Sequence, residues 1–422
     1  MAKKEKKEKK LKKSKVEIQE AVNEQATVET IDDFAAQIEQ ELEKQEQESK
    51  YVEKVIVQDG KTFIDITANY VSEPEETTVQ EPVETQVVHQ KKKVRTFNEI
   101  FGSFFKGFIP LKKDSTKEKI RKLVMDVAIV AIIVCGFSYG KLYYERQVEL
   151  NLEEELKGQI FNESEMNADE ISQAWKDVLA MHPNIDFGDI DLKYSYLYAV
   201  NQDLVGWVKI ENTNLDVQVV QAEDNDFYLR RNFYKESSRY GCPYMDYRNN
   251  GRYLDTNTVI YGHHMTDGLM FSNLDKYKSL EGYKESPIIQ FDTLYDTYYF
   301  KVFAAFVTNA HPEEDNGYIF NFTINNFGTD RRYNQFIKEV QKRSLINTGV
   351  TVNSDDKIIT LVTCTYDFRE ARLVVMGRLV RPGEDLTVDT SGASLNTSPK
   401  YPQAWYDENG VDNPYNSDEK WE

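Results

Sequence analysis

The chain is 422 residues long, carries a formal net charge of -19, and is 40% hydrophobic. A protein that binds nucleic acid needs a basic face to neutralise phosphates, so this composition argues against a nucleic-acid-binding protein. The sequence has three cysteines, and one of them, Cys135, lies in an apolar run, which excludes a small secreted fold held by disulfides. A single Cys242–Cys364 disulfide remains open.

Residues 1–95 are predicted to be a largely disordered, charged region on the cytoplasmic side. The first 15 residues are dominated by lysine, which indicates a solvated tail or contact with an anionic membrane surface. Residues 16–90 are rich in Glu, Gln and Thr, a composition that buries too little apolar surface to offset the entropy of folding. Two local exceptions are a helical pattern at 31–42 and two short strands within Val55–Ile66, around an Asp-Gly turn.

Residues 96–122 combine basic and aromatic side chains, which suits a helix in a membrane interface; a partner-binding or disordered segment is the alternative. The following apolar run at 123–144 is about twenty residues long, so as a helix it spans roughly 30 Å, the thickness of a bilayer core. Its one acidic residue, Asp126, lies within a turn of the basic end. We therefore predict a transmembrane helix, with a buried helix of a globular domain as the alternative.

The charges on the two sides of this run differ. Lysine and arginine cluster before it, at 112–122, whereas a glutamate-rich stretch follows it. The positive-inside rule then places the N-terminus in the cytoplasm and the residues after about Tyr144 outside the cell.

The remainder is predicted to be a mainly β domain. Residues 145–200 are expected to form a stalk and N-terminal helices, residues 201–382 the domain itself, and residues 383–422 a flexible tail rich in Ser, Asn, Asp and Pro. Short apolar and β-branched runs separated by turn residues indicate a closed or nearly closed eight-stranded β-barrel. The runs are Val205–Ile210, Leu215–Gln221, Gly241–Tyr247, Asn257–His264, Pro287–Leu294, Tyr298–Thr308, Lys357–Cys364 and Ala371–Val380. A helix is expected at about 330–342, between the sixth and seventh strands.

Three strand ends carry chemically useful side chains: His263, Cys364 and Arg372. A free thiol has a pKa near 8.5, so only about 3% of it is thiolate at pH 7, and a nearby cation raises that fraction. Arg372 can supply the cation and stabilise an oxyanion, while His263 can protonate a departing amine. Taken singly, each residue has an ordinary alternative role. Cys364 could be a thiol packed in the core, and His263 with His264 could be a structural or metal-binding pair. Arg372 could form a salt bridge with Asp367 or Glu370.

The motifs around these residues resemble the sortase family. Thr360–Cys364 (TLVTC) matches the pattern Thr-Leu-any-Thr-Cys, Tyr261–Met265 (YGHHM) matches the segment with the family histidine, and Arg372 in ARLVV matches the family arginine. The resemblance covers roughly residues 170–382. It is closest to class B, because of segments 205–229 and 241–249 and the helix inserted between the sixth and seventh strands.

The resemblance implies a sortase-type barrel and a cysteine transpeptidase that forms a thioester intermediate. Cys364 would be the nucleophile, His263 the general acid and base, and Arg372 the stabiliser of the oxyanion or substrate. His264 is the less favoured histidine, and no cofactor or metal is implied. Substrate-binding residues are carried over to Asn225, Leu229 and Thr363.

The implied substrates are surface proteins with a C-terminal sorting signal of the Leu-Pro-any-Thr-Gly or Asn-Pro-any-Thr-Asn/Gly type. The implied acceptor is an amine of peptidoglycan or its precursor, on the outside of a Gram-positive cell, with the enzyme anchored in the membrane lipid by a single span. The alternatives are a pilin-polymerising sortase that uses a lysine amine, a non-catalytic membrane scaffold with a degenerate barrel, and a cysteine protease that uses water. The sequence shows no obvious Asp-Pro-aromatic lid before the barrel, which favours anchoring.

Overall fold

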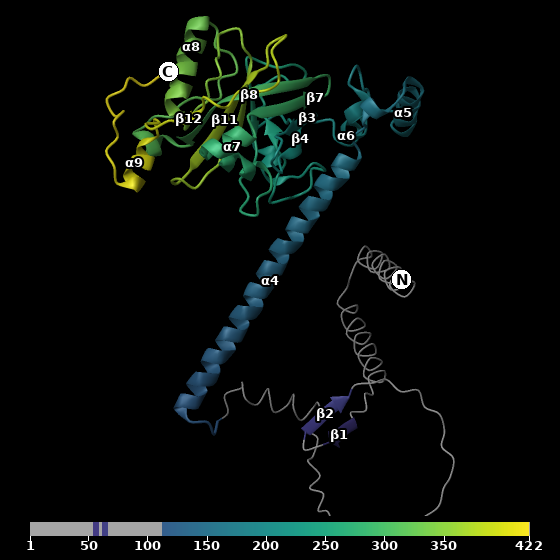
Figure 1. The fold of residues 1–422 in the computed structure, drawn as a ribbon, viewed down its shortest axis with the longest axis vertical. Helices are drawn as coiled ribbons and strands as arrows, with labels where there is room; N and C mark the ends of the chain where they lie inside the picture. The colour runs from purple at the N-terminus through teal and green to yellow at the C-terminus, as the bar shows by residue number, and fades with distance from the viewer. Residues whose placement is uncertain (1–53, 59–60, 66–111, 422) are drawn as a thin grey trace, which may run out of the picture. The chain divides into compact units, whose positions relative to one another are not determined.

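The computed structural model describes residues 54–58, 61–65 and 112–421 (Figure 1). The chain divides into two compact units, residues 1–95 and 96–422. In the first unit β1 (Lys54–Gln58) and β2 (Lys61–Asp65) pair antiparallel, which confirms the two short strands predicted there. The helix predicted at 31–42 and most of the basic and aromatic segment, 96–111, lie outside the described residues.

A closed barrel of eight strands forms the body of the second unit, in the order β10-β11-β8-β7-β3-β4-β5-β6. The β4–β5 and β10–β6 pairs are parallel and the other pairs are antiparallel. The eight predicted strands are thus confirmed, with small shifts at their ends. Their bounds are β3 Leu204–Lys209, β4 Asp216–Val220, β5 Tyr244–Met245, β6 Asn257–Tyr261, β7 Ile288–Thr293, β8 Thr297–Asn309, β10 Ile358–Cys364 and β11 Ala371–Leu379.

Alternation along the strands divides their side chains between the barrel interior and its outer face. In β10, Ile359 and Leu361 belong to the interior cluster, whereas Ile358 and Val362 pack in a second cluster on the outer face. That outer cluster includes α8 (Asp330–Arg343), the helix predicted between the sixth and seventh strands. The odd and even positions of β10 therefore face different environments.

Between residue 112 and the first barrel strand, the second unit is mainly helical. Its helices are α4 (Thr116–Gly158), α5 (Ala168–Met181) and α6 (Ser195–Val200). Of the helices that the structure describes, α4 alone is long and apolar enough to cross a membrane, and none of its apolar window is buried. It contains the predicted span at 123–144 and continues to Gly158 without a break.

The predicted flexible tail is folded against the domain in the structure. β12 (Ser394–Leu395) pairs with β9 (Ile346–Asn347), and α9 (Gln403–Asn409) follows. The ring of Trp421 lies 5.5 Å from that of Phe336 in α8. The composition of this segment is polar, but its few aromatic residues supply the contacts that hold it.

The described residues also contain shorter elements. They are η1 Glu163–Glu165, η2 Leu192–Tyr194, η3 Phe227–Arg230, η4 Phe271–Lys278, α7 Leu280–Glu285 and η5 Pro312–Asp315. Two of them, η3 and η4, lie beside the site described next.

Candidate active site

Three neighbouring strands bring His263, Cys364 and Arg372 side by side. Cys364 at the end of β10 is paired directly with Arg372 of β11. On the other side of β10, Val362 is paired with Tyr261 of the parallel strand β6, and the Gly262 amide donates to the Val362 carbonyl at 3.0 Å. His263 is the next residue after Gly262, just beyond the end of β6. Residues opposite each other on adjacent strands share one face of a sheet, so Cys364 and Arg372 belong to the outer face that carries Val362.

A groove of about 450 Å³ runs along this outer face. Tyr261, Val362 and Arg372 line it from β6, β10 and β11. Its opposite wall is the segment 319–323, between β8 and α8. Cys364 does not line the groove; it is two residues beyond Val362 on the same face of β10 and is paired with Arg372, which does line it.

The imidazole of His263 is oriented by the backbone of η3. Its Nε2 lies 2.8 Å from the carbonyl oxygen of Leu229. Because a carbonyl oxygen only accepts hydrogen bonds, Nε2 carries a hydrogen and donates it. The Nδ1 atom is therefore the ring nitrogen left to exchange a proton with a substrate or with the thiol.

His264 has a different environment. Its Nε2 is 2.6 Å from Asp275 Oδ2, its side chain is 9% exposed, and its ring meets the ring of Tyr366 edge-on at 5.1 Å. These contacts fix His264 between η4 and the β10–β11 loop. Of the two adjacent histidines, His264 has its Nε2 held by a carboxylate, whereas His263 is held by a backbone carbonyl.

The cysteines are free, so the possible Cys242–Cys364 disulfide is absent. Cys242 is 3% exposed, and its burial raises the pKa of its thiol well above the usual range, although Gln218 Nε2 donates to Sγ at 3.4 Å. A thiol kept protonated in this way is a poor nucleophile. Cys364 is only partly buried, and it is paired with Arg372.

Arg372 keeps most of its donors available. One Nη donates to the Ala371 carbonyl at 3.0 Å and the other lies 3.5 Å from Glu370 Oε2, while the side chain is 25% exposed. A guanidinium has five N–H donors, and these contacts use two of them. Glu370 is thus the acidic neighbour of Arg372, whereas Asp367 pairs with Lys278 at 2.6 Å.

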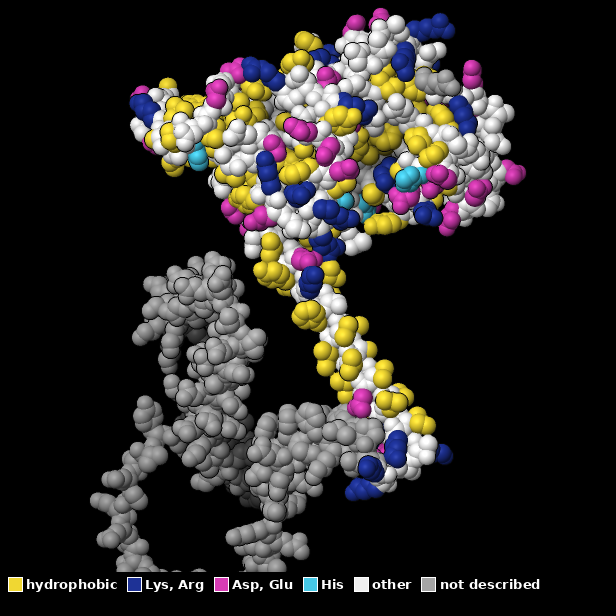
Figure 2. Space-filling view, turned by 180° about the vertical axis from the view of Figure 1, so that it is seen from behind, with side chains coloured by type: hydrophobic (Ala, Val, Ile, Leu, Met, Phe, Trp, Pro, Cys, Tyr) yellow, Lys and Arg dark blue, Asp and Glu magenta, His cyan; other side chains and the backbone are white. Residues whose placement is uncertain are grey.

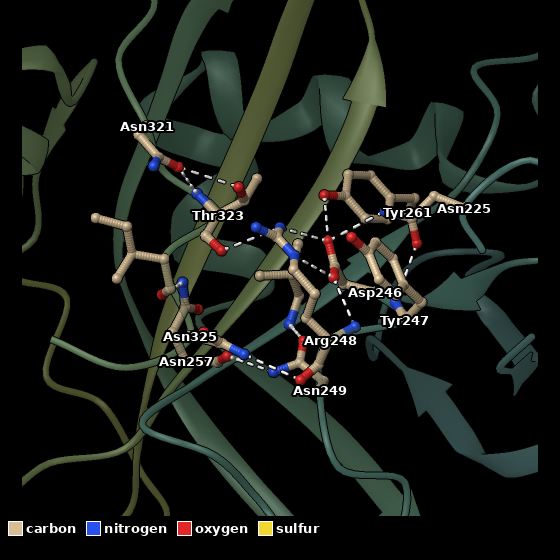
Figure 3. A network of polar contacts seen from close by, with 12 residues as sticks. Asn225, Asp246, Tyr247, Arg248, Asn249, Asn257, Tyr261, Asn321, Thr323 and Asn325 are labelled. Atoms are coloured by element: carbon tan, nitrogen blue, oxygen red, sulfur yellow. Dashed lines mark hydrogen bonds and ion pairs between the residues drawn. The ribbon is translucent and has the colours of Figure 1, made fainter. Parts of the chain in front are cut away.

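A buried carboxylate, Asp246, lies at the centre of a network of polar contacts next to Tyr261, which lines the groove (Figure 3). Asp246 accepts two hydrogen bonds of 2.8 Å from the Arg248 guanidinium, one of 3.0 Å from the Tyr261 hydroxyl and one of 3.2 Å from Asn225 Nδ2. Burial raises the pKa of Asp246, but the hydrogen bonds from Arg248 and Tyr261 outweigh burial and lower it below its ordinary value. Asp246 is therefore ionised and holds Tyr261 in place in the groove.

The same network fixes the opposite wall. Arg248 Nη2 donates to the Thr323 carbonyl at 3.3 Å, and Asn325 Nδ2 donates to the Arg248 carbonyl at 3.0 Å (Figure 3). Asn257, at the start of β6, donates to the Ile324 carbonyl at 2.9 Å. The wall segment is thus tied to the strands that carry the candidate catalytic residues.

Comparison with known proteins decides the family. The Sortase domain family model matches residues 208–380. Sortase B of Staphylococcus aureus is 30% identical over 261 residues, which cover 61% of this chain and 96% of that relative. The chain belongs to the sortase family, class B type. Sortases are transpeptidases, and that general activity applies here.

The chain is also similar to a second curated relative and to solved sortase structures. Sortase B of Listeria monocytogenes is 33% identical over 195 residues, which cover 46% of this chain and 76% of that relative. The solved Staphylococcus aureus sortase B-substrate complex is 32% identical; the match covers 50% of this chain and 94% of the solved chain, with a TM-score of 0.42. The solved sortase B of Clostridium perfringens is 34% identical; the match covers 44% of this chain and 98% of the solved chain, with a TM-score of 0.41.

The residues expected to bind substrate have three different positions in this sortase. Asn225 belongs to the Asp246 network: its Nδ2 donates to Asp246, and its Oδ1 accepts from the Tyr247 amide at 3.0 Å. Leu229 contacts His263 through its carbonyl. Thr363 does not join them: it is 2% exposed and alternates with Cys364 along β10, so its side chain faces the interior of the barrel.

Several residues of the site were not anticipated. They are Tyr261, Asn309, the segment 319–323, Asp246 and Lys278. No sequence pattern predicts these residues. The inward orientation of Thr363, in contrast, is predictable from the sequence, because adjacent residues of a strand point to opposite faces. Within residues 54–58, 61–65 and 112–421, no three His, Cys, Asp or Glu side chains are grouped so that they could hold a metal ion.

Proposed function

We propose that this sortase cleaves the C-terminal sorting signal of surface proteins and transfers them to an amine of the cell wall. Cys364 is the nucleophile, His263 the general acid and base, and Arg372 the group that stabilises the oxyanion. The observation that supports the proposal is strand pairing: Cys364 is paired with Arg372, and His263 follows β6, the strand on the other side of β10.

Acylation begins when the thiolate of Cys364 attacks the carbonyl carbon of the signal's threonine. A C–S bond forms, and the carbonyl electrons move to the oxygen, whose negative charge the Arg372 guanidinium stabilises. When the tetrahedral intermediate collapses, the C–N bond breaks and the Nδ1 hydrogen of the imidazolium of His263 passes to the departing amine. The product is a thioester on Cys364.

Transfer reverses these roles. The acceptor amine attacks the thioester carbon while His263, now neutral, takes up the amine proton at Nδ1. The C–S bond then breaks, the thiolate of Cys364 leaves, and a new amide joins the surface protein to the acceptor. The hydrogen bond from Nε2 to Leu229 supports both steps because it keeps Nδ1 as the exchanging nitrogen.

The chain is proposed to be anchored in the cell membrane by residues 123–144 of α4, with its N-terminus in the cytoplasm and its catalytic domain outside. The apolar helix before the sortase domain and the basic residues before that helix support this orientation. Protease added to intact cells is expected to degrade the catalytic domain and to spare an epitope tag fused before Met1. Loss of the tag with retention of the domain would reverse the orientation.

The acceptor is tested by competition. The full chain in detergent is incubated with peptides that carry each signal variant and with two amines, an oligoglycine amine as a cell-wall mimic and a lysine side chain in a pilin-like peptide. Transfer mainly to the oligoglycine amine supports anchoring, whereas transfer mainly to lysine supports the pilin-polymerising alternative. Release of hydrolysed peptide alone would point to a protease, and no turnover of any signal would favour the scaffold.

A further inference from the structure

Where α4 leaves the proposed membrane span, it docks firmly on the catalytic domain. Leu152 and Leu156 are 7% and 0% exposed and belong to a cluster with the barrel. Polar contacts add to this packing: Tyr234 donates to Glu155 at 2.7 Å, and Arg239 lies 3.6 Å from Glu145. The end of the span therefore has a defined position relative to the domain.

A cavity of about 420 Å³, which we call the junction cavity, lies at this end. The side chains that matter are Tyr139, Leu142, Tyr143 and Arg146 from α4 and Arg239 and Asp267 from the domain. Asp267 is four residues beyond His263, so the cavity touches the loop that follows the candidate catalytic histidine.

One side of the junction cavity is apolar and uncovered. Tyr139, Leu142 and Tyr143 are 73%, 49% and 57% exposed. They occupy the last turns of the proposed span, where tyrosines commonly mark the boundary between hydrocarbon and headgroups. In a bilayer these side chains would contact the upper part of an acyl chain.

The other side is basic. Arg146 has no hydrogen-bond or ion-pair partner among residues 54–58, 61–65 and 112–421. Arg239 has one, Glu145, whose carboxylate also lies 3.8 Å from Lys141. Figure 2 shows lysine and arginine side chains gathered where α4 meets the domain. Arg146 is only a few residues past the span, at the depth of phospholipid phosphates.

Of the residues that line the cavity, Asp267 carries the one carboxylate: Oδ2 accepts from the Tyr240 hydroxyl at 2.6 Å, and Oδ1 accepts from the Leu269 amide at 3.4 Å. It disfavours a small inorganic anion, but its second oxygen can accept from a hydroxyl of a headgroup. The cavity therefore combines an apolar side, two cationic side chains and one acceptor.

We propose that the junction cavity binds one anionic phospholipid of the outer leaflet, of the phosphatidylglycerol type. Its phosphate lies between Arg146 and Arg239, its acyl chain along Tyr139, Leu142 and Tyr143, and a glycerol hydroxyl at Asp267. This site rests on the membrane anchoring proposed above. The bound lipid would contact both the membrane anchor and the loop that follows His263.

The test uses the full chain in nanodiscs that contain phosphatidylcholine with an increasing fraction of phosphatidylglycerol or, separately, phosphatidylethanolamine. Lipid retained after mild detergent extraction is measured by native mass spectrometry. We expect about one retained phosphatidylglycerol per chain, in preference to both zwitterionic lipids. Arg146→Gln with Arg239→Gln should lower that retention about fivefold or more, because each basic residue near the surface contributes measurably to anionic lipid binding.

The matched control is Lys141→Gln, which removes a cation from an exposed position of the same helix outside the cavity. It should retain the lipid, and cleavage of a signal peptide in detergent should show that the double variant is folded. Equal retention of the three lipids, or an equal loss in Lys141→Gln, would overturn the site while the anchoring stands. A chain that does not enter the bilayer at all would contradict the anchoring itself.

Discussion

Arg372 is the residue whose charge the proposed reaction uses most directly. Replacing it with alanine should lower kcat about 10²–10³-fold with little change in KM, because the guanidinium acts on charge that develops in the tetrahedral intermediate. Arg372→Lys keeps the charge but loses the planar fork, so it should recover only part of the rate. Steady-state kinetics with a signal peptide measure both. Arg369→Ala is the control, since Arg369 is exposed in the same loop.

An effect of Arg372→Ala on KM alone would contradict this role. It would assign Arg372 to uniform substrate binding instead.

A change at Thr363 is expected to alter the stability of the protein and not its activity. Its hydroxyl is buried in the barrel interior and has no hydrogen-bond partner. Thr363→Val keeps the shape of the side chain and removes that hydroxyl, so it should raise the free energy of unfolding by about 1 kcal/mol and leave kcat/KM unchanged. Chemical denaturation and peptide cleavage measure the two quantities. A fall of kcat/KM by tenfold or more would restore Thr363 to the substrate groove.

Among the elements, the β10–β11 loop has the most direct bearing on the site, because it joins Cys364 to Arg372. Lys278, at the end of η4, donates to Thr365 Oγ1 at 2.5 Å and to Asp367 Oδ2 at 2.6 Å. It also lies 3.3 Å from Asp275, the partner of His264. One ammonium group thus connects the loop to the segment that follows His263.

Lys278→Ala should therefore lower kcat about tenfold by releasing the loop, while KM changes less. Lys278→Arg should retain part of the activity, and Lys284→Ala, on the exposed side of α7, should retain all of it. Thermal unfolding of each variant separates a positioning role from a general loss of stability. Equal kcat values for Lys278→Ala and Lys284→Ala would exclude the role.

The docking of α4 carries its own dependence on pH. Glu149 is 3% exposed, and burial, with a smaller contribution from the charge of Glu153, raises the pKa of Glu149 to about 8. Between pH 4.5 and about 8, the folded state therefore keeps a proton that the unfolded state has released. The free energy of unfolding falls as the pH rises through this window. One pKa unit corresponds to about 1.36 kcal/mol, so the loss is at most roughly 5 kcal/mol.

Glu149→Gln should flatten this part of the stability curve and should stabilise the chain most near pH 8. Thermal unfolding at a series of pH values from 5 to 8 measures the slope. Parallel curves for the two proteins would mean that Glu149 is not buried in the docked helix.

At the scale of the whole molecule, the sequence predicted the architecture better than the details of the site. The eight strands were predictable because β-branched runs and turn residues alternate regularly, and α4 because its apolar run is long. His263, Cys364 and Arg372 were recognisable as strand-end residues within family motifs. Their lateral register depends on the parallel pairing of β6 with β10, which no local pattern encodes.

The remaining features depend on contacts distant in the chain. Asp246 meets Tyr261 and Asn225 only after the barrel closes, and Lys278 meets Asp367 across 89 residues. The tail was misjudged because an average over its polar composition hides Trp405 and Trp421, the residues through which it packs. Composition and periodicity do not predict which distant residues make contacts of this kind.

The most direct test of the account is to trap the acyl-enzyme. The full chain in detergent is mixed with a signal peptide, quenched in acid, digested and mapped by mass spectrometry, with Cys242→Ala and Cys364→Ala run in parallel. We predict a thioester adduct of the N-terminal peptide fragment on Cys364, unchanged in Cys242→Ala and lost together with cleavage in Cys364→Ala. Cleavage of the peptide by Cys364→Ala at the rate of the unchanged chain would contradict the account.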